Sequence, residues 1–205
     1  MFGVAGLRSQ LLGPRKGGAY AFWAVIGVLG HLFGGALVGG LLGWLGVLLP
    51  HSAYPSALVL LGLACLAWSA HEFAFFEMPM PQLHRQVPRR WMGALPWNWV
   101  AFGYGLQLGS GVATRITVTT TYSAFALALL SGSPLAGAII GSAFGFARAQ
   151  MPLWTGRRIR SPQESMALAE SLATRELPMR RLNGFVLGVA GLALTASPWL
   201  GLSAL

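Results

Sequence analysis

The sequence contains no aspartate, and its five acidic residues are all glutamate. Enzymes built on a nucleophile–histidine–acid set need a well-placed carboxylate, and metal enzymes need ligands clustered at characteristic spacings. The chain shows neither pattern. We therefore expect that the protein is not an enzyme and that it binds no cofactor.

Cysteine is almost absent as well. The single cysteine, Cys65, lies inside an apolar run. One cysteine forms neither an intrachain disulfide nor a C-x-x-C redox pair. Any disulfide exchange by this chain therefore needs a sulfur from a partner, because exchange joins an attacking thiolate to a second sulfur.

Charge is the third scarcity: 9% of the 205 residues are charged, whereas 55% are hydrophobic. Ordinary soluble domains carry about 25% charged residues. Several apolar runs reach the roughly 20 residues that cross a bilayer. This composition predicts an all-α, multi-pass protein of the inner (plasma) membrane. Residues 1–17 do not begin a cleavable signal peptide, because the first hydrophobic run is too long and no A-x-A-like site follows it, so we expect that run to stay in the protein.

The distribution of the 14 basic residues predicts how the chain is oriented. Three lie in 1–17, three in 77–96 and seven in 148–181, between the apolar runs rather than in a basic tail. Cytoplasmic loops carry such an excess, so the N-terminus is expected inside and the C-terminus outside. The expected partners are the lipid bilayer and either another membrane protein or a second copy, but not nucleic acid.

The apolar runs predict five transmembrane helices in one membrane domain over residues 1–205. Ser161 to Glu164 forms a capping box with proline at the first helical position, which predicts a cytoplasmic surface helix over 161–177. Glycines spaced four apart in the first run favour close packing of helices. The expected membrane helices are 19–49, 56–76, 97–130, 135–154 and 182–202.

The run 97–130 is long for one crossing and carries the most unusual residues. Glycines in its first half can bend or unwind the helix, as in transporters that bind solutes at a broken helix. A charge at mid-bilayer costs about 3 kcal/mol, so Arg115 should face protein or water. The alternative for the hydroxyls is bonding to the helix's own carbonyls. The candidates for a transport path here are Gln107, Thr114, Arg115 and Thr117.

Two further ionisable residues lie in apolar runs. His31 is in the middle of the first run and Glu72 is near the end of the second. Ionisable residues at membrane depth are candidates for an ion or proton path. The alternatives are that a neighbouring carbonyl satisfies His31, and that Glu72 snorkels to the interface or pairs with an arginine.

The loop after the second run holds a weak candidate for a metal site. Met78, Met80 and His84 lie close together, and such soft ligands suit Cu(I). Alternating methionine and proline is equally typical of a loop.

A modest internal repeat is present. Residues 60–67 and 186–193 share the pattern apolar-apolar-Gly-apolar-Ala-x-Leu-Ala. With one membrane helix between the two halves, the copies form an inverted repeat, as in many secondary transporters.

Two stretches resemble the CcdA/DsbD-type cytochrome c biogenesis family: AFGYGLQLGSGVATR (101–115) and ALALLSGSPLAGAIIGSAFGFA (126–147). The resemblance implies a six-helix fold of inverted three-helix repeats that carries reducing equivalents across the inner membrane, with 19–203 as helices two to six. The family's first helix and both redox cysteines have no counterpart in this chain, and Cys65 matches neither cysteine. Only the fold is therefore expected to carry over.

Three functions remain open from the sequence. The first is movement of a small solute or ion through a cleft between the repeats. The second is a non-catalytic accessory or assembly subunit of a larger membrane complex. The third is a divergent thiol-reductant conduit whose cysteines come from a partner.

Overall fold

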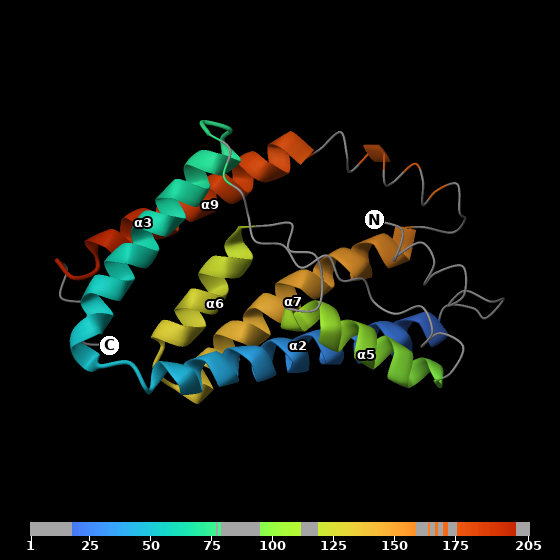
Figure 1. Cartoon of the computed structure of the whole chain (residues 1–205). Helices are drawn as coiled ribbons and strands as arrows, with labels where there is room; N and C mark the ends of the chain where they lie inside the picture. Colours follow the sequence, from blue (N-terminus) through green and yellow to red (C-terminus); the bar gives the residue numbers. More distant parts are fainter. Residues whose placement is uncertain are drawn as a thin grey trace. The chain divides into compact units, whose positions relative to one another are not determined.

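The computed structural model describes residues 18–76, 78, 95–111, 119–158, 164, 167, 170–171 and 176–199, and every regular element among them is helical. This part of the chain contains no strand, in agreement with the expected all-α class. Figure 1 labels the α-helices. They are α2 (Gly18–Gly46), α3 (Tyr54–Glu72), α5 (Trp97–Ser110), α6 (Thr120–Leu130), α7 (Pro134–Arg158) and α9 (Glu176–Ala196), with a short 3-10 turn η1 (His51–Ala53) before α3.

Two helices are long and apolar enough to cross a membrane. Phe22–Gly46 has a mean hydropathy of 2.0 and Tyr54–Glu72 one of 1.3. Both expose large apolar side chains, as a helix facing lipid does. By length and composition, these two helices could each cross a membrane.

The helix expected over 97–130 is two helices in the structure. Its first part, α5, ends where Gly111 adopts the left-handed conformation with φ of 69°, and the Gly111 amide donates to the Leu108 carbonyl. Glycine is the usual residue at such a helix end because it has no Cβ to clash. The second part, α6, begins at Thr120. The expected surface helix 161–177 lies largely outside the described residues.

The chain forms two compact units, which divide α2 after Val38 and α7 after Ile140. In the first unit, α2 packs against α5 and α7 through glycines. A Cβ on Gly30 would meet the Phe102 carbonyl, and one on Gly35 would meet the Gly141 carbonyl. Small residues permit this close approach, which is the main source of helix association in lipid.

In the second unit, α3 and α9 run antiparallel along their whole length (Figure 1). Gly62 of α3 faces Thr195, and Ser69 faces Gly188. Leu61, Cys65 and Leu187 form the small buried core of this unit, with Trp68 and α6 side chains packed around it. This packing holds the last turn of α3 against the first turns of α9, where the polar site lies.

Candidate functional site

A buried polar network joins three helices of the second unit at Glu72. The Glu72 side chain is 8% exposed. Its Oε1 accepts hydrogen bonds from Thr119 Oγ1 and Asn183 Nδ2, each 2.8 Å away. Its Oε2 accepts from Arg180 Nε at 3.2 Å, which completes an ion pair. Thr120 Oγ1 extends the network by donating to Asn183 Oδ1 at 3.0 Å. The name Glu72 network is used below for these five residues.

Local sequence explains why the network forms at helix ends. Glu72 is the last residue of α3, and Arg180 also donates from Nη2 to the His71 carbonyl at 3.2 Å. Arg180 therefore satisfies a terminal carbonyl of α3 and neutralises Glu72 at once. Thr119 is the N-cap of α6, but it donates its hydroxyl to Glu72 rather than capping its own helix.

Every oxygen of the Glu72 carboxylate is paired. The Glu72 side of the ion pair is buried, whereas the Arg180 side chain is 36% exposed. Desolvation of the carboxylate is offset when further hydrogen bonds satisfy its lone pairs, and here Thr119 and Asn183 supply them. The expected pairing of Glu72 with a nearby arginine is what the geometry shows. The network fixes the start of α6 against the α3–α9 pair, so it is the strongest candidate site in the described chain.

A second polar centre lies in the first unit at His31, which is 3% exposed. Its Nδ1 donates to the Gly27 carbonyl at 2.7 Å, and its Nε2 is buried without a partner among the described residues. Added Cβ atoms on Gly105, Gly109 and Gly145 would each meet His31 or its neighbouring turn. The expected carbonyl partner is therefore present, and two other helices close directly on this residue.

Arg148 lies near His31, and Tyr104 lies near Arg148. The Arg148 guanidinium also lies 5.6 Å from the centre of the Phe144 ring. The contacts of Gly105, Gly109 and Gly145 bring α5 and α7 against α2 at His31.

Of the other candidate residues from the sequence, the structure describes Gln107 and Met78. Gln107 lies on α5, and its Oε1 is buried without a partner among the described residues. Met78 donates its amide to His71 Nδ1 at 3.2 Å, so it takes part in a loop contact. No group of three His, Cys or Glu ligands is present in the described part of the chain. Thr114, Arg115, Thr117, Met80 and His84 lie outside the described residues.

Cys65 is fully buried, and its Sγ lies 3.4 Å from Ser123 Oγ. A thiol-exchange cysteine must be reached by a partner sulfur, and buried cysteines in apolar surroundings are inert. This cysteine therefore belongs to the packing of α3 against α6.

Sequence reasoning missed most of the partners in the Glu72 network. Asn183 carried no signal of its own, and Arg180 was counted only as a charge that orients the chain. One clue was available: the repeated pattern in 60–67 and 186–193 brings the two helices together, which places 180–183 near the end of α3.

The sequence is similar to several proteins named methylamine utilization protein MauF. The protein from Methylorubrum extorquens is 32% identical over 175 residues, covering 85% of this chain and 56% of the relative. The one from Paracoccus denitrificans is 37% identical over 106 residues, covering 51% of this chain and 38% of the relative. That from Methylobacillus flagellatus is 31% identical over 144 residues, covering 65% and 50%. The chain spans about half the length of these relatives. No family model matches it, and no solved structure gives a significant match.

These similarities correct the family assignment. The chain resembles MauF proteins, not the CcdA/DsbD-type family. Short stretches of glycine and aliphatic residues recur in unrelated membrane proteins because few residue types suit lipid, so the two matched stretches were weakly specific.

The functional expectations are corrected with it. The relatives are named for methylamine utilization, and nothing in the similarities points to solute transport, to an accessory subunit or to cytochrome c biogenesis. The burial of Cys65 also argues against the hypothesis of a thiol-reductant conduit. The transport hypothesis had rested on glycines and polar residues within the apolar run 97–130, a pattern that is not specific to transporters.

Proposed function

We propose that this chain is a multi-pass inner-membrane protein that serves methylamine utilization. The observation that carries this proposal is the 32% identity to the MauF protein of Methylorubrum extorquens, which extends over 85% of the chain. The apolar helices support the membrane location, since two of them have the length and hydropathy of membrane spans. Catalysis by the chain itself is not part of the proposal, because the described residues bring no nucleophile, base and acid together.

Five membrane spans with the N-terminal lead inside form part of this proposal, and contacts in the second unit support an inverted repeat. Gly62 and Gly188 hold the same position in the repeated pattern, and Ser69 and Thr195 follow each of them by seven residues. In space Gly62 faces Thr195 and Gly188 faces Ser69. A two-fold axis between antiparallel helices produces such an exchange of partners.

The Glu72 network is the part of the molecule on which we expect this role to depend. It contains the one acidic residue within the apolar helices α2, α3, α5, α6 and α7. Ionisable residues kept inside a membrane are costly and serve a purpose. Their purpose here is to fix α6 against α3 and α9.

Deletion of the gene in its own host tests the proposal. The deletion strain is expected to lose growth on methylamine as the sole nitrogen or carbon source and to keep normal growth on succinate with ammonium. A plasmid copy of the wild-type chain should restore growth on methylamine. Normal growth of the deletion strain on methylamine would overturn the proposed role.

A further inference from the structure

One face of α9 carries an exposed arginine between exposed apolar residues. Leu177, Arg181 and Phe185 are spaced by four and therefore lie in a row on the helix. Leu177 is 65% exposed, Phe185 is 63% exposed, and Arg181 is exposed between them. A cation bordered by apolar side chains on both sides along a helix is unusual for a surface that faces only water.

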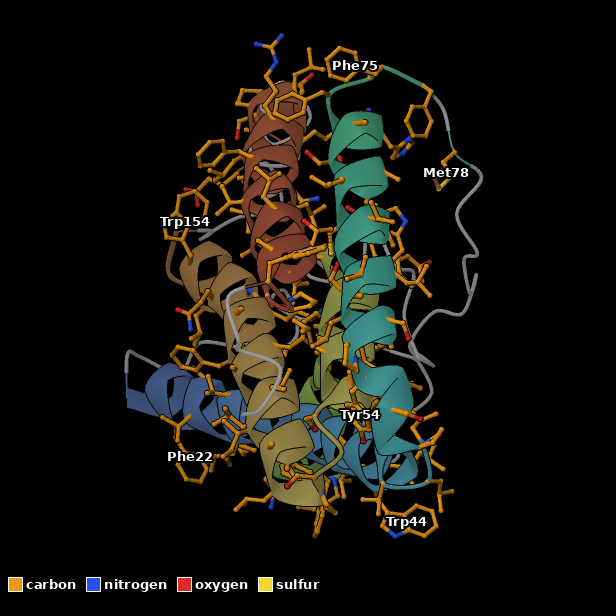
Figure 2. The ribbon with its side chains drawn as sticks, turned by 90° about the vertical axis from the view of Figure 1, so that its left-hand side faces the viewer. Phe22, Trp44, Tyr54, Phe75, Met78 and Trp154 are labelled. Carbon is orange, nitrogen blue, oxygen red and sulfur yellow. The ribbon has the colours of Figure 1, made fainter. Side chains whose placement is uncertain are left out.

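The turn after α3 displays aromatic rings in a fixed arrangement. Ala74 has a φ of 61°, which is unusual for a residue with a Cβ. The amides of Phe73, Ala74 and Phe75 donate back to carbonyls of the last turn of α3 at 2.9 to 3.1 Å. Phe75 is 80% exposed, and Figure 2 shows it at the end of α3, away from Tyr54. The turn thus leaves the Phe75 ring on the surface of the molecule.

These two features lie at the same end of the α3–α9 pair. The Phe73 ring lies against Gly184, and Arg180 donates to the His71 carbonyl. Phe73 and Phe75 also contact each other, with ring centres 6.3 Å apart. The name lipid face is used below for Phe73, Phe75, Leu177, Arg181 and Phe185.

The lipid face has a net positive charge. Glu72 neutralises Arg180 in the ion pair. Within the described part of the chain, Arg181 takes part in no ion pair, so its charge is left for an external anion. That anion must itself sit among hydrocarbon, because apolar residues flank Arg181 on both sides.

We propose that the lipid face binds an anionic phospholipid, such as phosphatidylglycerol. The headgroup phosphate pairs with Arg181, the acyl chains run along α9 and contact Phe185, and Leu177 and Phe75 border the headgroup region. A phospholipid carries an anionic phosphate linked to hydrocarbon chains, and the lipid face complements it with a cation beside apolar side chains. The inference rests on the proposed membrane location but not on the role in methylamine utilization.

The test uses the full chain purified in mild detergent and native mass spectrometry. Phosphatidylglycerol and phosphatidylcholine with identical acyl chains are added in turn. Wild type is expected to retain phosphatidylglycerol about fivefold better, the factor that corresponds to about 1 kcal/mol for one surface arginine. Arg181→Gln should lower this preference to about one. The same change at Arg158, the last residue of α7, should leave the preference intact.

A second variant separates the apolar contribution. Phe75→Ala should weaken retention of both lipids while keeping the preference for phosphatidylglycerol. Trp199→Ala is the matched control, since Trp199 is 89% exposed and lies beyond the opposite end of α9. Circular dichroism and gel filtration establish that each variant is folded.

Several outcomes would overturn the proposal. They are equal retention of the two lipids by wild type, an unchanged preference in Arg181→Gln, and recovery of an acidic protein partner in place of lipid. A chain released from membranes by carbonate would defeat the membrane location itself. Lipid binding with normal growth of the deletion strain on methylamine would leave this inference standing and defeat only the proposed role.

Discussion

Glu72 is the residue whose environment is most demanding. Its carboxylate is buried and takes hydrogen bonds from Thr119, Asn183 and Arg180. Removing one partner from such a pair costs more than replacing the whole pair by apolar residues, because the remaining charge loses its counter-ion. The single residue therefore controls the stability of the junction between α3, α6 and α9.

We predict that Glu72→Ala lowers the free energy of unfolding by about 1.5–3 kcal/mol, because Thr119, Asn183 and the 36% exposed Arg180 lose their charged acceptor. Thermal unfolding in mild detergent measures the loss. Glu170→Gln is the control, since Glu170 is exposed and should leave stability unchanged. A melting temperature for Glu72→Ala equal to that of wild type would show that the network does not stabilise the fold.

His31 gives the opposite prediction. Its Nε2 is buried without a partner among the described residues, and such a group costs about 1–3 kcal/mol. His31→Leu keeps most of the side-chain volume and removes both ring nitrogens, the unpartnered Nε2 included. Stability should stay the same or rise by about 1 kcal/mol, measured by the same melting experiment. A large loss of stability would mean that the Nδ1 bond to Gly27 outweighs the cost at Nε2.

At this scale the sequence predicted the centres of the polar sites and the kind of partner for Glu72 and His31, but not which residues supply those partners. Glu72, His31 and Gln107 stand out because polar residues are costly in apolar helices. Asn183 and Arg180 do not, because their contact with Glu72 depends on how far α9 slides along α3. That register follows from glycine and hydroxyl contacts distant from the site.

At the scale of elements, glycine decides which helices approach. A Cβ on Gly35 would meet the Gly141 backbone, whereas one on Gly27 would come no closer than 3.9 Å to another residue. Replacement of glycine by alanine is therefore expected to have opposite effects on stability at Gly35 and at Gly27, although both lie in α2.

We predict that Gly35→Ala destabilises the fold by about 1–3 kcal/mol, because α2 and α7 must separate. Gly27→Ala should be neutral or stabilise by up to about 1 kcal/mol through helix propensity. Melting of both variants in the same detergent compares them. Equal losses in the two variants would contradict the close contact at Gly35.

The sequence predicted helices over the apolar runs because their length and composition demand them. Their ends were less well defined. The run 97–130 reads as continuous by hydropathy, and its glycines alone leave bending and breaking equally open. Gly111 ends α5 by adopting a left-handed conformation. Hydropathy does not register which backbone conformation a glycine adopts, so it does not locate this helix end.

At the scale of the whole molecule, orientation in the membrane makes a separate prediction. Cys65 is buried and is the only cysteine, so a Cys65→Ser chain provides a clean background for labelling. Ser52→Cys should react with a membrane-impermeant maleimide in intact cells, whereas Glu170→Cys should react only after the cells are opened. Both native residues are exposed. Labelling of Glu170→Cys in intact cells would contradict the proposed orientation.

The central claim is that methylamine utilization depends on this membrane protein through its Glu72 network. Its most direct test is growth on methylamine of the deletion strain carrying Glu72→Gln, compared with strains carrying wild type or Glu170→Gln at equal membrane levels. Glu72→Gln keeps the shape and removes the charge that pairs with Arg180. We predict that wild type and Glu170→Gln restore growth on methylamine, while Glu72→Gln fails to restore it, because the neutral amide no longer forms the ion pair with Arg180. Full restoration by Glu72→Gln would contradict the account.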